Sequence, residues 1–89
     1  MDKRQKILIV DDAEFNRVIL KEILGEKYNY LEAENGNQAI QMIGENIGID
    51  LMLLDINMPQ MNGFEVLGGA IGTGTVANNV SLLAQYVSL

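Results

Sequence analysis

Short apolar runs that end in an acidic residue recur along the first part of the chain. Residues 6–11 (KILIVD) and 49–55 (IDLMLLD) are almost continuously apolar, and each run closes on an aspartate. Runs of this kind are typical of strands that are buried on both faces of a parallel sheet. Residues 28–34 (YNYLEAE) form a weaker candidate, followed by the turn residues Asn35 and Gly36. The pattern therefore predicts three strands.

Between these strands, apolar residues recur at helical spacing. A first helix is predicted from about Glu14 to Leu24, with Asp12 as a candidate N-cap and Gly25 placed to end the helix. The apolar positions are Phe15, Val18, Ile19, Ile23 and Leu24 in this helix, and Ala39, Ile40, Ile43 and Ile47 in a second one.

This order of elements predicts a parallel sheet with right-handed crossovers and helices on both faces. Ligands of such sheets bind outside the carboxyl ends of the strands, where the strand order reverses. If the first and third strands are neighbours, Asp11, Asp12 and Asp55 converge at that edge.

Composition narrows the chemistry of such a cluster. The chain has 89 residues, which fits one domain, and a formal charge of −6 that argues against nucleic acid as a direct partner. Cysteine and histidine are absent, so a bound metal would need oxygen ligands. The apolar run Ile7 to Val10 is too short for a signal peptide, which favours a cytoplasmic location.

Close carboxylates also require compensation. Two carboxylates about 4 Å apart repel by about 4 kcal/mol at an effective dielectric near 20. Mg²⁺ suits them because it prefers octahedral oxygen ligands and commonly meets phosphate oxygens. An aspartate that ends a strand is by itself more often a turn residue or a helix cap. Two such strands, one with a pair of aspartates, shift the balance toward a site.

The loop DINMPQMNG, residues 55–63, carries the interpretation further. Together with the pair Asp11 and Asp12, it resembles the receiver domain of bacterial two-component response regulators, over residues 6 to about 67. This resemblance implies an α/β, flavodoxin-like fold and a signalling domain that is not an enzyme in the ordinary sense. The implied partner is a sensor histidine kinase or a phosphotransfer protein.

The resemblance also implies residue roles. Asp55 corresponds to the phosphoacceptor, which attacks a phosphohistidine to form an acyl phosphate. Asp12 corresponds to a direct Mg²⁺ ligand and Asp11 to one that acts through water. Asn57 would give its backbone carbonyl to the metal, and its side chain would face the phosphoryl group. Pro59 and Gly63 would shape the loop.

The tail departs from this family. All basic residues precede Tyr28 and the last acid is Glu65, so the final 24 residues carry no charge. We divide the chain into a receiver-like segment, 1–67, and a divergent tail, 68–89. The tail is too polar for a membrane span. The resemblance leads us to expect a Ser or Thr after a fourth strand and a Lys after a fifth, but no lysine follows Lys27.

The structure expected for the tail is helical. Gly68 and Gly69 weaken a third helix, while Val76, Val80, Leu83, Ala84 and Val87 fit a helical face. A short fourth strand ending at Ser81 is the alternative. A sheet of about three strands would leave the third as an unpaired apolar edge, so we expect self-association into a homo-oligomer.

We expect a receiver segment that accepts a phosphoryl group on Asp55 but is impaired by the loss of the C-terminal half of the domain. Two other functions compete with this one. A noncatalytic oligomerisation or interaction module is favoured by the absent lysine, whereas the complete acidic cluster and acceptor loop favour the receiver. The segment GTGTVA, residues 72–77, fits a dinucleotide-binding glycine pattern. No acidic residue follows it to bind a ribose, so we do not interpret it as a nucleotide site.

Overall fold

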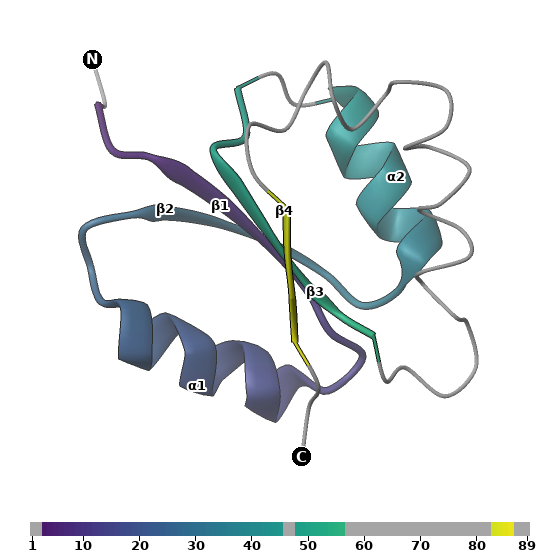
Figure 1. Ribbon diagram of the computed structural model, residues 1–89, viewed down its shortest axis with the longest axis horizontal. Helices are drawn as coiled ribbons and strands as arrows, with labels where there is room; N and C mark the ends of the chain where they lie inside the picture. Colours follow the sequence, from purple (N-terminus) through teal and green to yellow (C-terminus); the bar gives the residue numbers. More distant parts are fainter. Residues whose placement is uncertain (1–2, 46–47, 57–82, 87–89) are drawn as a thin grey trace.

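The computed structural model describes residues 3–45, 48–56 and 83–86. These residues form one parallel sheet with the strand order β2-β1-β3-β4. Helices α1 and α2 lie on opposite sides of the sheet (Figure 1). The elements are β1 (Lys6–Val10), α1 (Glu14–Leu24), β2 (Asn29–Ala33), α2 (Gly36–Glu45), β3 (Leu51–Asp55) and β4 (Leu83–Tyr86). The predicted flavodoxin-like α/β fold is confirmed, with the strand order reversing between β1 and β3.

The face of the sheet that α2 covers is an apolar core. Leu8 is aligned with Met52, and Val10 with Leu54, across the pair β1 and β3. All four side chains are buried and pack with residues of α2 and with the ends of the neighbouring strands. The remaining buried members of this core are Ala33, Ala39, Ile43 and Ile49. Alternate strand residues therefore point to this face, as the period of two requires.

The face that α1 covers is different. Ile7 and Ile9 are buried there, but Phe15 is 73% exposed and Ile23 is 74% exposed. The buried side chain of α1 is instead Arg17. The helical spacing therefore identified α1 correctly, while several of its apolar residues remain at the surface of the part of the chain that the structure describes.

A specific hydrogen bond marks the end of α1 and another marks the start of α2. The predicted end of α1 is confirmed: Gly25 has φ of 87° and donates its backbone N–H to the carbonyl of Lys21 at 2.9 Å. A positive φ of this size favours glycine because other residues carry a Cβ. At the start of α2, Asn35 Oδ1 accepts a hydrogen bond from the backbone N–H of Gln38 at 2.8 Å. Asn35 thus supplies a side-chain cap.

The prediction of Asp12 as the N-cap of α1 is wrong. The N-cap is Ala13, which makes no side-chain cap hydrogen bond. The carboxylate of Asp11 accepts the backbone N–H of Ala13 instead, at 2.9 Å. Since Asp12 is exposed and caps no helix, its carboxylate stays available at the edge of the sheet.

The prediction for the tail is also corrected. Leu83–Tyr86 form a fourth parallel strand next to β3, and not part of a helix. Pairing with the exposed edge of β3 satisfies backbone groups that a helix would leave unpaired there. Because β4 covers β3, the unpaired edge that motivated self-association does not exist in the described sheet. The suggested third helix and the alternative strand ending at Ser81 lie outside the described residues.

No helix within the described ranges is long and apolar enough to cross a membrane.

Candidate functional site

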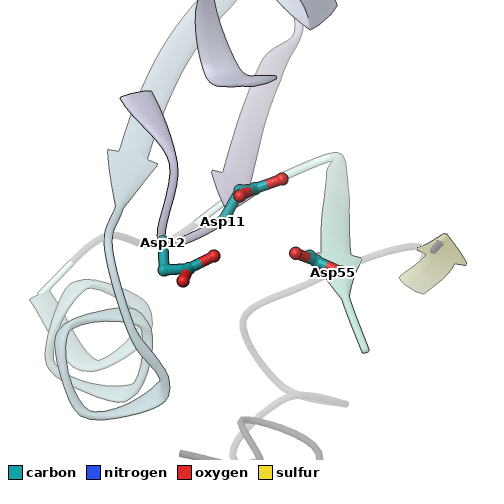
Figure 2. A group of neighbouring side chains, drawn as sticks. All are labelled: Asp11, Asp12 and Asp55. Carbon is teal, nitrogen blue, oxygen red and sulfur yellow. The ribbon is translucent and has the colours of Figure 1, made fainter. Parts of the chain in front are cut away.

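Three carboxylates meet at the carboxyl ends of β1 and β3. Asp11 and Asp12 follow β1, and Asp55 is the last residue of β3. One oxygen from each lies within 4.8 Å of the others. Figure 2 shows Asp12 and Asp55 directing their carboxylates toward the same space, with Asp11 beside them. The predicted convergence of these residues is therefore present, because β1 and β3 are adjacent strands.

Burial divides the three carboxylates into two kinds. Asp11 and Asp55 are fully buried, with no exposed surface, whereas Asp12 is exposed. Asp55 has interactions within the protein, while no described residue donates a hydrogen bond to its buried Oδ2 atom. Two buried carboxylates beside an exposed one form a site that is closed toward the sheet and open toward solvent at Asp12.

Both oxygens of Asp11 accept hydrogen bonds. Its Oδ1 atom accepts from the backbone N–H of Ala13 at 2.9 Å and from Asn16 Nδ2 at 3.4 Å. Its Oδ2 atom accepts from the hydroxyl of Tyr86 at 2.5 Å. Donors on both sides compensate the burial of this carboxylate, as a buried charge requires.

Tyr86 is a site residue that the sequence did not reveal. It lies in β4, aligned with Asp55, and its carbonyl accepts the backbone N–H of Ile56 at 3.0 Å. Burial, the hydrogen bond to Asp11 and the charges of Asp11 and Asp55 raise the pKa of Tyr86 above its ordinary value. No sequence pattern predicted Tyr86 as a site residue, because its position beside the acidic cluster depends on the register between β4 and β3.

Arg17 is a second unforeseen residue, and it brings a positive charge close to the cluster. Its Nη1 atom donates to the backbone carbonyl of Asp11 at 2.6 Å, and its Nε atom donates to Glu32 Oε1 at 3.0 Å. Lys21 Nζ binds the other oxygen of Glu32 at 2.9 Å. Arg17 follows Asp11 by six positions in the sequence. This spacing predicts no contact by itself, because the hydrogen bond to the Asp11 carbonyl depends on where α1 begins.

Lys21 and Arg17 also explain why the pKa of Glu32 is low. The hydrogen bond from Lys21 is the main cause that lowers the pKa of Glu32, and the bond from Arg17 adds to it against the opposing effect of burial. Glu32 therefore stays ionised and holds Arg17 in place beneath Asp11.

The donor set suits a hard divalent cation. Three carboxylate oxygens within 4.8 Å of one another match the preference of Mg²⁺ for oxygen ligands in small number, with water completing the coordination. Nitrogen and sulfur ligands are absent because the chain has no histidine or cysteine. Asn57, the remaining residue predicted for this site, lies outside the described residues.

Comparison with known proteins finds sequences that are similar to most of this chain. The family model described as "Response regulator receiver domain" matches residues 7–69. A chemotaxis protein CheY from Halobacterium salinarum is 45% identical over 62 residues, which cover 68% of this chain and 51% of that protein. The chain therefore spans about half the length of this curated relative.

Solved structures are also similar to this chain. TrrA from Thermotoga maritima, determined in complex with Mg²⁺ and BeF, matches with a TM-score of 0.72 and 35% identity, covering 94% of this chain and 71% of that one. A structure of the histidine kinase ThkA in complex with TrrA matches with a TM-score of 0.67 and 28% identity, covering 92% of this chain and 85% of the matched chain.

Proposed function

Because this chain belongs to the response regulator receiver family, we propose that it binds Mg²⁺ and accepts a phosphoryl group on Asp55 in two-component signalling. The observation that carries the proposal is the convergence of Asp11, Asp12 and Asp55 within 4.8 Å at the edge where the strand order reverses. Receiver domains are signalling domains and not classical enzymes. Any chemistry at Asp55 would be limited to gaining and losing its own phosphoryl group.

The described residues divide the work of holding the cation. Asp12, being exposed, would bind it directly, and Asp55 would contribute from the buried side. Asp11, with hydrogen bonds on both oxygens, would act through water. The backbone carbonyl of Asn57 would complete the protein ligands. When bound, Mg²⁺ supplies positive charge that offsets the carboxylates and the oxygens of a phosphoryl group.

Asp55 would act as the nucleophile. One of its carboxylate oxygens forms a bond to phosphorus while the P–N bond of a phosphohistidine breaks, and the electron pair returns to the imidazole nitrogen, which takes up a proton. The protein contributes mainly position, since phosphoryl transfer has a loose transition state that depends on alignment and charge. The end of β3, hydrogen-bonded between β1 and β4, supplies a rigid base for that alignment.

The proposed donor is a sensor histidine kinase or a phosphotransfer protein. Support comes from the match, at 28% identity, to a structure of the histidine kinase ThkA in complex with TrrA. Direct binding of nucleic acid is not proposed, because the net charge is −6. The cytoplasmic location and the homo-oligomeric state stay predictions, and the latter has lost the argument from an unpaired edge at β3.

Phosphorylation by a small acyl phosphate tests the proposal. We expect the intact chain to gain the mass of one phosphoryl group in the presence of Mg²⁺ and to gain none in excess chelator. Asp55→Asn should remove the gain. Asp50→Asn is the matched control, since Asp50 precedes the same strand at its opposite end and accepts the backbone N–H of Lys6 at 2.8 Å.

The rival function has its own outcome in this experiment. A folded chain that binds Mg²⁺ but gains no phosphoryl group would contradict phosphoacceptor activity. That result would favour the noncatalytic interaction module, in which the divergent tail has replaced the residues that complete the switch.

A further inference from the structure

Tyr86 reaches the acidic site from the far edge of the sheet. β3 lies between β4 and β1, so the contact with Asp11 crosses two strand spacings, about 9 to 10 Å in all. The hydroxyl nevertheless donates to Asp11 Oδ2 at 2.5 Å. Because Tyr86 is aligned with Asp55 on the intervening strand, its side chain has to cross the end of β3 to reach Asp11. The phenol hydroxyl therefore contacts the acidic cluster directly.

Asp11 does not need Tyr86 for its orientation. The Oδ1 atom is already fixed by the backbone N–H of Ala13 at 2.9 Å and by Asn16 at 3.4 Å. What the hydroxyl adds is a donor on Oδ2, the oxygen that Ala13 and Asn16 do not contact. A donor at this place reduces the repulsion among the carboxylates and so reduces their demand for a cation.

The hydroxyl keeps its proton while it donates to Asp11. The ordinary pKa of a tyrosine phenol is about 10, so the group is uncharged in neutral solution. It competes with a cation through this hydrogen bond and gives up no proton in doing so.

We propose, building on the cation site of the previous section, that the Tyr86 hydroxyl occupies Asp11 in the cation-free chain and gives way when Mg²⁺ enters. Tyr86 thereby lowers the affinity of the site for the cation. Tyr86 competes with the cation for Asp11, and it comes from the tail that lies outside the resemblance to the family. Because the coupling is reciprocal, bound Mg²⁺ weakens the contact between Tyr86 and Asp11 to the same extent.

Titration calorimetry with Mg²⁺ alone tests this role. Tyr86→Phe removes the hydroxyl and keeps the ring, so we expect it to bind Mg²⁺ about five- to twenty-fold more tightly than the unchanged chain, the range expected for part of one hydrogen bond to a charged group. Tyr30→Phe is the matched control. The Tyr30 hydroxyl also donates a hydrogen bond of 2.5 Å, to the carbonyl of Gly25, but away from the acidic site. Its removal should leave the Mg²⁺ affinity unchanged.

The unchanged chain offers a second measurement that does not depend on the variant folding. The protein has three tyrosines and no tryptophan, so its near-ultraviolet absorption reports on tyrosine. We expect Mg²⁺ to shift this absorption as the Tyr86 hydroxyl leaves a carboxylate. The shift should survive in Tyr30→Phe and be lost in Tyr86→Phe.

The outcomes separate the two proposals. Equal or weaker Mg²⁺ binding by folded Tyr86→Phe, or a tyrosine spectrum that Mg²⁺ does not change, would overturn the competing role and leave the cation site standing. Absence of Mg²⁺ binding in every folded variant, including the unchanged chain, would overturn the cation site itself.

Discussion

The two faces of the sheet are built from different physical interactions. On the α2 face, Leu8, Val10, Met52 and Leu54 are buried in an apolar core. On the α1 face, the buried side chain of the helix is Arg17, which donates hydrogen bonds to Glu32 and to the carbonyl of Asp11. Several apolar residues of α1 stay exposed. The first face therefore supplies stability, and the second connects the helix to the acidic site.

This division has a simple physical origin. Burial of apolar area is non-directional and tolerates any good packing, whereas a buried guanidinium must find acceptors at defined positions. Arg17 fixes the position of the Asp11 backbone because its carbonyl accepts the Nη1 hydrogen bond. We therefore expect core substitutions to change stability and α1 substitutions to change the site.

The largest effect should follow a cavity in the α2 face. Leu8 is fully buried, so Leu8→Ala should lower the free energy of unfolding by about 3 kcal/mol, through lost transfer energy and an unfilled cavity. Ile23→Ala is the matched control on α1, where the side chain is 74% exposed, and should change stability by less than about 0.5 kcal/mol. Urea unfolding measures both. An equal loss of unfolding free energy in the two variants would contradict the claim that the α2 face supplies the stability.

A smaller effect should follow removal of the guanidinium. Arg17→Met leaves the carbonyl of Asp11 and one oxygen of Glu32 without a donor, and should cost about 2 kcal/mol of unfolding free energy. It should also weaken Mg²⁺ binding, because the backbone of Asp11 loses a contact. Lys21→Met, which removes only the partly exposed partner of Glu32, should cost less than about 1 kcal/mol. A stable Arg17→Met variant with unchanged Mg²⁺ affinity would contradict the link between α1 and the site.

The smallest effect should appear as a dependence on pH. Lys21 and Arg17 lower the pKa of Glu32 below its ordinary value of 4.5. The stability that the ionised carboxylate contributes is therefore present above pH 4.5 and is lost as pH falls through the lower pKa of the folded state. Glu32→Gln should cost less than about 1 kcal/mol at neutral pH, because the group is partly exposed, and this difference should shrink in acid.

Unfolding of both chains across this range checks the sign. A difference that grows toward low pH would mean that Glu32 is not stabilised in its ionised form. The effect of Glu32→Gln is then measured in a chain that also carries Arg17→Met and Lys21→Met. There the stability difference caused by Glu32→Gln should no longer depend on pH, because the two cations that bind Glu32 are gone.

Much of the site could be predicted from the sequence because its parts are local. The acidic ends of residues 6–11 and 49–55 indicated the strands, and they indicated a shared site on the condition that the first and third strands are neighbours. The structure fulfils this condition. The end of α1 at Gly25 was equally local, since a residue with positive φ was needed there. These features depend on few residues and short distances along the chain.

The remaining features depend on tertiary context. Leu83 and Ala84 fit a helical face, yet they pair with β3 because that strand offers an unpaired edge. Asp12 looked like a cap, yet the carboxylate of Asp11 took the backbone N–H of Ala13. Tyr86 joined the site only through the register of β4, 75 residues away from Asp11 in sequence. Periodicity carries no information about such long-range competition.

The most direct test of the central claim is to locate the phosphoryl group. The chain is incubated with Mg²⁺ and a small acyl phosphate, treated with borohydride to reduce the acyl phosphate to an alcohol, and mapped by peptide mass spectrometry. We predict one modified residue, Asp55, and none when Mg²⁺ is withheld. Modification at Asp50 or at another acid, or none at all in a folded chain that binds Mg²⁺, would contradict the assignment of Asp55 as the phosphoacceptor.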